Sequence, residues 1–214
     1  MANVVSFTNA WALIEQQKFP GHRKVPIGHP VAFGRINNEY DCWYVWKQLL
    51  PQISAMNSRL FLAPQTYNPA ADLFHNYINT GRGYVDLTYD QFKLPLWFTE
   101  IGLDRIKRDH VNGVTAQLKG CINYSKQNPS KLIGCCMFQY ADKVWMQGTT
   151  EGSFGTYTHA RPGPITVTYT SQDFTHSDYV PKSNPPVSIP LGTLNIDTLE
   201  KTDLYEAVTN AYKT

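Results

Sequence analysis

The sequence predicts an α/β protein with a parallel sheet of the (β/α)-barrel type. Two observations lead to this prediction. Short apolar segments alternate with helical patterns along residues 3–147, and polar or aromatic residues follow each apolar segment. Apolar strands separated by helices are typical of parallel sheets covered by helices. In (β/α) barrels the site lies at the carboxyl ends of the strands, so we expect it there.

Each element has its own signal. Apolar runs bounded by Pro, Gly or polar residues predict four strands, at residues 24–33, 59–67, 94–102 and 132–140. Apolar residues at helical spacing, with Gly or Pro stops, predict helices at residues 8–18, 40–56, 70–79, 110–126 and 202–212. We expect the Gly-, Pro-, Ser- and Thr-rich residues 148–195 to be long loop, with one short strand at residues 165–170.

The composition excludes several classes of protein. The 214 residues are 42% hydrophobic and 17% charged, which excludes a disordered chain. The net charge of +2 comes from scattered residues, which disfavours a nucleic-acid site. No apolar run reaches the ~18 residues of a membrane span, and we expect no signal peptide in this chain. The sequence lacks Gly-rich phosphate motifs and zinc spacing among its four cysteines, so we expect no cofactor and no metal.

Polar residues follow every predicted strand. They are Arg35, Asn37 and Asn38 after the first, Gln65, Thr66, Tyr67 and Asn68 after the second, Glu100 at the end of the third, and Gln139, Tyr140, Asp142 and Lys143 after the fourth. Glu100 is the most informative, because a carboxylate at the end of a buried strand is costly unless it is paired or hydrogen-bonded. It is either a structural ion pair with Arg105 or Lys107, or a carboxylate held at a site wall, as a glycosidase nucleophile requires.

Several segments resemble the family-seventeen glycoside hydrolases, the β-1,3-glucanases of glycosidase clan A. Residues 96–104 (LWFTEIGLD) resemble the strand and S/T-E-x-G nucleophile motif of the clan. Residues 133–145 and 148–155 (GTTEGSFG) resemble the eighth barrel strand and its loop. Residues 3–30, 60–68 and 84–92 are similar to elements around strands five to seven, so the likeness covers residues 3–158.

The resemblance implies a role for each candidate residue. Glu100 is the expected nucleophile of a retaining double displacement. Asp142, Lys143 and Glu151 correspond to a polar cluster that tunes the nucleophile and holds sugar hydroxyls, although the family more often has Glu at the position of Asp142. The remaining substrate-binding candidates are Gln65 and Asn68 as hydroxyl ligands, and Tyr67, Tyr140, Trp97 and Trp145 as stacking faces. For Trp97 and Phe138, burial in the core is the better interpretation.

One departure from the family matters. Its acid/base is a Glu in an Asn-Glu pair at the end of strand four, and Asn38-Glu39, the one such pair here, comes after the first predicted strand of this chain. The resemblance therefore implies strands five to eight without strands one to four. A whole barrel usually takes about 250 residues, which is more than the 214 residues of this chain. We expect a fragment of a longer product, or a chain that needs a partner half, and no activity from the chain alone.

The expected organisation is a half barrel over residues 1–158, a loop-rich insertion over 159–198 and a closing helix over 199–214. The expected function is a retaining β-glucan hydrolase or its nucleophile-bearing half, with a polysaccharide substrate. A transglycosylase, a non-catalytic carbohydrate-binding remnant and an unrelated α/β interaction domain remain alternatives. By family resemblance the protein is secreted or associated with the cell wall.

Overall fold

The computed structural model describes residues 2–34, 41–53, 58–106, 109–142, 152–159, 164–169, 187–192 and 199–213. The chain forms two compact units. The first contains Met1–Gly102 and Gly113–Met137, and the second contains Leu103–Asn112 and Phe138–Lys213. Glu100 lies in the first unit and Asp142 in the second.

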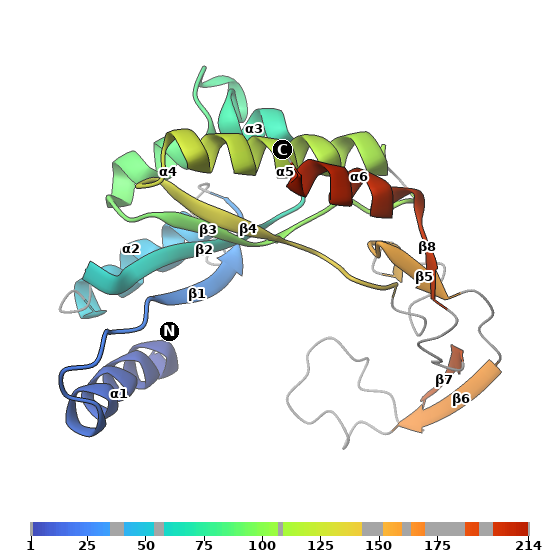
Figure 1. The fold of residues 1–214 in the computed structure, drawn as a ribbon. Coiled ribbons are helices and arrows are strands. Elements are labelled where there is room, and N and C mark those ends of the chain that lie inside the picture. The colour runs from blue at the N-terminus through green and yellow to red at the C-terminus, as the bar shows by residue number, and fades with distance from the viewer. Residues whose placement is uncertain are drawn as a thin grey trace. The chain divides into compact units, whose positions relative to one another are not determined.

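A four-stranded parallel sheet is the centre of the first unit (Figure 1). It consists of β1 (Ile27–Ala32), β2 (Leu60–Thr66), β3 (Leu96–Ile101) and β4 (Leu132–Met137), in the order β1-β2-β3-β4. All three strand pairs are parallel. The predicted α/β class and its four strands are therefore confirmed, and the sequential strand order is consistent with part of a barrel.

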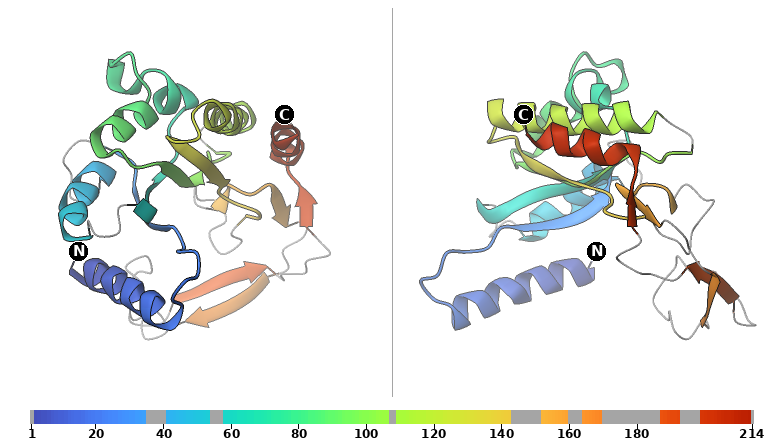
Figure 2. Two further views of the ribbon diagram at one scale, coloured as in Figure 1. Left: turned by 60° about the vertical axis from the view of Figure 1, so that its left-hand side comes forward. Right: turned by 45° about the vertical axis from the view of Figure 1, so that its right-hand side comes forward.

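One helix precedes the sheet and the others connect its strands. They are α1 (Ala2–Lys18), α2 (Cys42–Ile53), α3 (Ala70–Phe74), the 3-10 helix η2 (Tyr77–Asn79), α4 (Tyr84–Phe92) and α5 (His110–Gln127). Helices α3, α4 and α5 lie over one face of the sheet (Figure 1). The left view of Figure 2 shows the strands on the inside and these helices on the outside. Pro51 lies inside α2 and does not end it. The helix continues to Ile53, whose side chain is buried.

Two predicted helices differ from the structure. The first begins at Ala2 rather than Thr8, because the Thr8 hydroxyl does not cap a helix start but donates to the carbonyl of Val4 one turn earlier, at 2.7 Å. The helix predicted over residues 70–79 is interrupted after Phe74. The side chain of Asn76 accepts a hydrogen bond from the backbone N–H of Gly81 at 2.8 Å, which favours a turn over a continuous helix.

The hydrophobic core lies between the sheet and its helices. Fully buried strand residues Leu62, Leu96, Phe98 and Leu132 share this layer with helical residues. The helical residues are Trp46, Leu49, Tyr84 and Leu118.

The other face of the sheet carries apolar side chains that remain in contact with water. Side chains alternate between the two faces along a strand, so Phe61 and Trp97 lie opposite the buried layer. Trp97 is 36% exposed and Ile133 is 47% exposed. Within the part of the chain that the structure describes, β1 and β4 each pair with a strand on one side only.

The second unit contains short antiparallel pairs and the last helix. Strand β5 (Tyr157–His159) pairs with β8 (Leu199–Lys201), and β6 (Pro164–Tyr169) pairs with β7 (Val187–Gly192). Helix α6 (Asp203–Tyr212) follows, as predicted. The short strand predicted at residues 165–170 is confirmed by β6, whereas β5 and β7 lie in the predicted loop.

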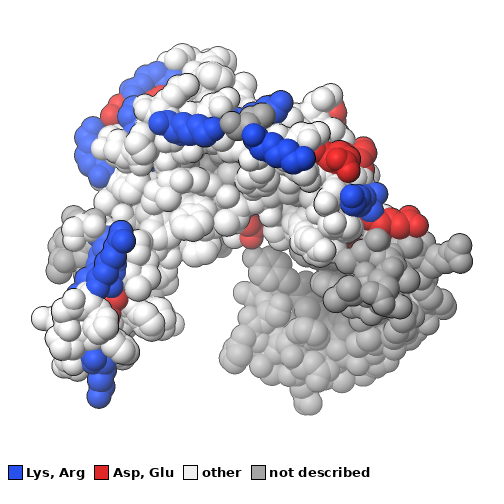
Figure 3. Space-filling view, in the orientation of Figure 1, with Lys and Arg blue, Asp and Glu red and all other residues white. Residues whose placement is uncertain are grey.

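The surface charges are unevenly distributed. On the face shown in Figure 3, lysine and arginine side chains gather over the helices of the first unit and on α1, and the strand side is almost uncharged. Among the described helices, none is both long and apolar enough to cross a membrane.

Candidate carboxylate site

Glu100 is held by two side chains from the neighbouring strand. The Nε2 of Gln65 donates a hydrogen bond to Oε1 of Glu100 at 2.8 Å. The hydroxyl of Tyr67 donates a hydrogen bond to Oε2 of Glu100 at 2.5 Å. Each carboxylate oxygen therefore has one neutral donor, and the carboxylate is held in one orientation.

The pairing register of β2 and β3 explains this arrangement. Leu62 pairs with Leu96, so regular pairing would place Gln65 opposite Thr99. An irregularity between these pairs instead places Gln65 opposite Glu100. Such an extra residue re-aims the side chains that follow it, a common feature near sites. Tyr67 lies two residues after Gln65, on the same side of the chain, and so reaches the second oxygen.

The chemistry of the carboxylate follows from its partners. An ionised carboxylate has about four lone-pair sites, and the two hydrogen bonds occupy two of them. Lone pairs therefore remain for a bond to a substrate carbon. Glu100 is half-buried at the carboxyl end of β3. This is where the sequence predicted a nucleophile.

The alternative interpretation of Glu100 is an ion pair with Arg105 or Lys107. Arg105 pairs with Asp142 within the second unit. Lys107, the other predicted partner, lies outside the described residues. The partners of Glu100 thus come from the same sheet edge. The sequence named them as a candidate sugar ligand and a candidate stacking face but did not connect them to Glu100.

The loop after β2 is anchored by its backbone. The amide of Gln117, a buried residue of α5, donates to the carbonyl of Asn68 at 2.7 Å. The N–H of Asn68 donates to the hydroxyl of Thr66 at 3.1 Å. The half-buried Asn68 therefore stands on a fixed loop next to Tyr67, and its role as a hydroxyl ligand stays a prediction.

Trp97 lies on β3, three residues before Glu100. Its ring centroid is 5.8 Å from that of Phe61, on the uncovered face of the sheet. The sequence favoured the core for Trp97, but the side chain is 36% exposed. Phe138 is half-buried and packs edge-on against Phe154 in the second unit.

Asp142 is the centre of a polar cluster in the second unit. It forms an ion pair with Arg105, and its Oδ1 accepts a hydrogen bond from the N–H of Gly155 at 2.8 Å. Arg105 also donates to the carbonyl of Gly155 at 2.9 Å. The side chain of Asp142 is only 8% exposed. In this arrangement Asp142 anchors the Gly155 loop, and its predicted contact with sugar stays a prediction.

Gly155 has a physical reason to be glycine. A Cβ at this position would lie 2.4 Å from the backbone nitrogen of Asp142 and 2.5 Å from the carbonyl oxygen of Tyr157. Backbone atoms on both sides cannot yield as a flexible side chain can. The Ser-Phe-Gly segment singled out in the sequence thus brings the backbone of Gly155 close to that of Asp142, and its N–H holds the Asp142 side chain.

The other predicted site residues are only partly described. Tyr140 is 66% exposed, and its ring packs against Tyr157. Lys143, Trp145 and Glu151 lie outside the described residues, as does Glu39. The predicted cluster of Asp142, Lys143 and Glu151 therefore stays a prediction.

His110, the first residue of α5, was not singled out in the sequence. It is 5% exposed, and neither ring nitrogen has a hydrogen-bond partner in the described structure. Burial lowers the pKa of His110, and the charge of Arg105 lowers it further, against the opposing effect of Asp203. Its Nδ1 lies 4.0 Å from Oδ1 of Asp203. Sequence spacing gave no signal for this contact, because the two residues are far apart in the chain.

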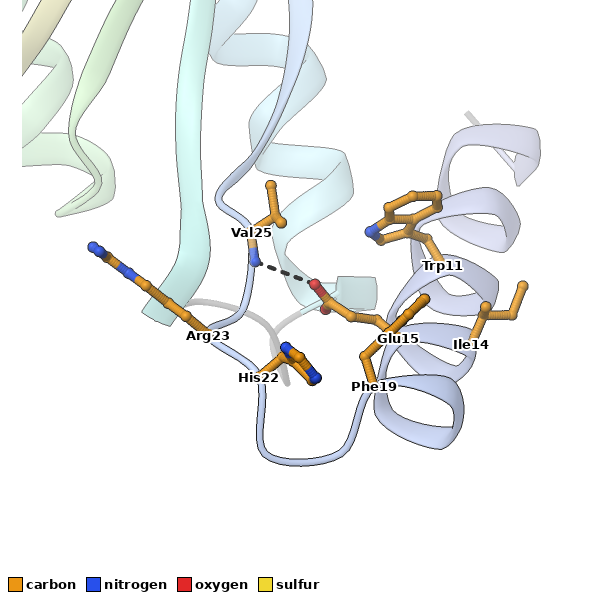
Figure 4. Close-up of a pocket in the computed structure, with 7 residues that line it drawn as sticks. All are labelled: Trp11, Ile14, Glu15, Phe19, His22, Arg23 and Val25. Atoms are coloured by element: carbon orange, nitrogen blue, oxygen red, sulfur yellow. Dashed lines mark hydrogen bonds between the residues drawn. The ribbon is translucent and has the colours of Figure 1, made fainter.

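A mainly apolar pocket lies at the end of α1 (Figure 4). Its apolar lining residues are Trp11, Ile14, Phe19 and Val25. Glu15 points to the connecting segment and accepts a hydrogen bond from the N–H of Val25 at 3.2 Å. Glu15 also pairs with Arg59, directly before β2. This ion pair ties α1 to the sheet, so the pocket is a consequence of helix packing.

Among the described residues, no group of three or more His, Cys, Asp or Glu side chains is arranged to hold a metal ion.

Comparison with known proteins adds a weak structural likeness. No family model matches the sequence, and no curated protein matches it. Among solved structures, the chain is similar to beta-glucosidase 1317, with 11% identity, a TM-score of 0.46, and coverage of 98% of this chain and 48% of that chain. A beta-glucosidase from Exiguobacterium marinum matches with 11% identity, a TM-score of 0.38, and coverage of 72% and 51%.

A hyperthermophilic beta-glucosidase from Pyrococcus furiosus matches with 13% identity, a TM-score of 0.36, and coverage of 64% of this chain and 37% of that chain. This chain therefore spans between about a third and a half of the length of these three proteins. At such TM-scores the likeness carries no argument about the site. The fold class follows from the parallel sheet itself.

Proposed function

We propose that this chain carries the nucleophile of a retaining glycoside hydrolase that acts on β-glucan, with β-1,3-glucan as the first candidate. One observation supports the proposal above all others. Glu100 lies at the carboxyl edge of a parallel sheet and is held by Gln65 and Tyr67, one donor to each oxygen. The choice of β-glucan is supported by the resemblance of residues 96–104 and 148–155 to the family motifs.

The proposed reaction has two steps. An oxygen of Glu100 attacks the anomeric carbon, and the bond from that carbon to the leaving sugar oxygen breaks as a proton is delivered to that oxygen. Water, which gives hydrolysis, or a hydroxyl of another sugar, which gives transglycosylation, then attacks the anomeric carbon. This attack breaks the bond to Glu100, and the proton of the attacking group passes to the second carboxylate. Gln65 and Tyr67 keep the carboxylate aimed during both steps.

The proton donor is proposed to come from a partner half barrel. A retaining mechanism needs a second carboxyl group about 5–5.5 Å from the first. The described outer strands β1 and β4 have free edges, and Trp97 and Ile133 leave apolar surface on the uncovered face. Free edges and apolar faces are normally paired or covered in stable proteins, which supports a partner that adds strands there.

Covalent labelling tests the nucleophile without a proton donor. A 2-deoxy-2-fluoro-β-glucoside with a dinitrophenolate leaving group needs no acid for its first step and leaves a long-lived ester. We expect mass spectrometry to find this adduct on the peptide that contains Glu100. The Glu100→Gln variant is expected to remain unlabelled, and Asp72→Asn, in the first turn of α3, is the control that keeps labelling. An adduct on another residue, or none in wild type after prolonged incubation, contradicts the proposal.

Turnover of a soluble β-1,3-glucan tests the partner half separately. We expect none from the purified chain alone. Clear turnover that Glu100→Gln abolishes would support the nucleophile and overturn the need for a partner half.

A further inference from the structure

Three tyrosine rings form a row in the second unit. The ring of Tyr140 lies 4.9 Å from that of Tyr157, at 43° between their planes. The ring of Tyr157 lies 5.2 Å from that of Tyr205 on α6, at 64°. Tyr140 is nevertheless 66% exposed, so most of its ring surface is open to water at the end of the row.

The backbone fixes this row in place. The N–H of Tyr157 and the hydroxyl of Thr156 both donate to the carbonyl of Tyr140, at 3.0 and 2.7 Å. The N–H of Asp142 donates to the carbonyl of Tyr157 at 3.0 Å. Asp142 is itself held by Arg105 and Gly155. A fixed aromatic side chain loses little conformational freedom when it binds a ligand.

The surroundings of the row select the class of ligand. The Nζ of Lys201 lies 4.0 Å from the centroid of the Tyr205 ring. The Lys201 ammonium also pairs with Glu206 at 3.7 Å. The row thus combines ring faces with hydroxyl groups, and Lys201, its neighbouring cation among the described residues, has a counter-charge in Glu206.

These properties disfavour an anionic ligand. Proteins that stack nucleic-acid bases on aromatic side chains also line the path of the nucleic-acid backbone with Lys and Arg. The described stretch around the row instead carries three exposed acidic side chains, Glu200, Asp203 and Glu206. A pyranose ring is neutral, has a flat face of C–H groups that fits an aromatic ring, and has a rim of hydroxyls that fits tyrosine hydroxyls.

We propose that Tyr140, Tyr157 and Tyr205, all in the second unit, form a binding platform for a neutral oligosaccharide. The inference rests on the proposed function for its choice of glucan as the sugar. The geometry of the platform belongs to the second unit alone.

Binding of hexasaccharides to the full chain tests the platform. Isothermal titration with the β-1,3- and β-1,4-linked glucose hexamers measures affinity for wild type, Tyr140→Ala and Tyr140→Phe. We expect Tyr140→Ala to weaken binding about tenfold, the upper end of what an aromatic contact contributes. Tyr140→Phe keeps the ring and is expected to stay close to wild type. Tyr212→Ala, which removes a 55% exposed tyrosine from the end of α6, is the matched control and is expected to change nothing.

Glu100→Gln separates this proposal from the proposed function. In this background Tyr140→Ala is expected to weaken hexamer binding by the same factor as in the wild-type chain, whether or not labelling shows that Glu100 is a nucleophile. The platform is overturned by the absence of binding to wild type at millimolar sugar, or by equal affinities of wild type and Tyr140→Ala. Loss of binding in Glu100→Gln but not in Tyr140→Ala also overturns it, as does tighter binding of a single-stranded oligonucleotide than of either hexamer.

Discussion

The hydroxyl of Tyr67 donates a hydrogen bond across 2.5 Å to Oε2 of Glu100, and so joins the loop after β2 to the carboxyl end of β3. Among the described residues, the other donor to Glu100 is the neutral amide of Gln65. The orientation of the carboxylate thus depends on two neutral hydrogen bonds.

Replacement of Tyr67 by phenylalanine tests this dependence. The variant keeps the ring and loses the hydrogen bond, so Glu100 gains rotational freedom. We expect the rate of covalent labelling at Glu100 to fall by roughly 10²-fold, as for other misplaced reacting groups. The pH profile of labelling is the second measurement, because a purely structural residue leaves its shape unchanged. An unchanged rate and profile would show that Tyr67 does not position the carboxylate.

Removal of Arg105 tests the Asp142 cluster. Arg105→Ala removes the ion pair of Arg105 with the buried Asp142 carboxylate and one donor to the Gly155 carbonyl, which keeps the hydrogen bond from the Thr202 hydroxyl. Breaking one side of a buried pair typically costs about 3–5 kcal/mol, and we expect the lower end because Arg105 itself is 26% exposed. Urea denaturation measures the loss. Arg82→Ala breaks the exposed pair with Asp90 and is the control, for which we expect no measurable change.

Replacement of Gly155 by alanine tests the close backbone approach. The added Cβ meets backbone atoms of Asp142 and Tyr157, and overpacking of this kind costs about 1–3 kcal/mol. Gly134→Ala on β4 is the control, because a Cβ there meets nothing within 4 Å. Thermal unfolding of the two variants side by side is the measurement. Equal melting temperatures would contradict the described packing at Gly155.

The stability of the second unit is expected to fall in mild acid. His110 has a lowered pKa in the folded chain, so it stays neutral where the unfolded chain, with a pKa near 6.5, takes up a proton. Protons then favour the unfolded state, and stability is lost as the pH falls below about 6.5. The slope from this one residue is at most about 1.4 kcal/mol per pH unit.

His110→Gln isolates this contribution. Denaturation between pH 7 and pH 5 is expected to show a shallower loss of stability in the variant than in wild type. Parallel slopes would show that His110 does not contribute. His29, whose pKa burial also lowers, remains in both proteins and so cancels from the comparison.

The four strands of the sheet could be predicted because each is a continuous apolar run between helical patterns. The strands β5, β7 and β8 could not, because each pairs with a strand that is distant in the sequence, and short antiparallel pairs have little local signal. The break after Phe74 depends on one side-chain hydrogen bond from Gly81 to Asn76. Spacing patterns do not contain that information.

The site was predicted in part for a similar reason. Glu100, Gln65 and Tyr67 could be named because they follow apolar strands. Their mutual contact could not, because it depends on the irregular register between β2 and β3. The contact of Asp142 with Arg105 and Gly155 depends on tertiary structure in the same way.

The exposed indole of Trp97 gives the protein an intrinsic optical probe. It lies on the strand of Glu100, on the face that water reaches, so its fluorescence responds to whatever covers that face. A partner half or a bound glucan that excludes water from the indole shifts its emission to shorter wavelength. The difference between wild type and Trp97→Phe isolates this signal from the other tryptophans. Assembly and substrate occupancy can thereby be followed in real time without a label.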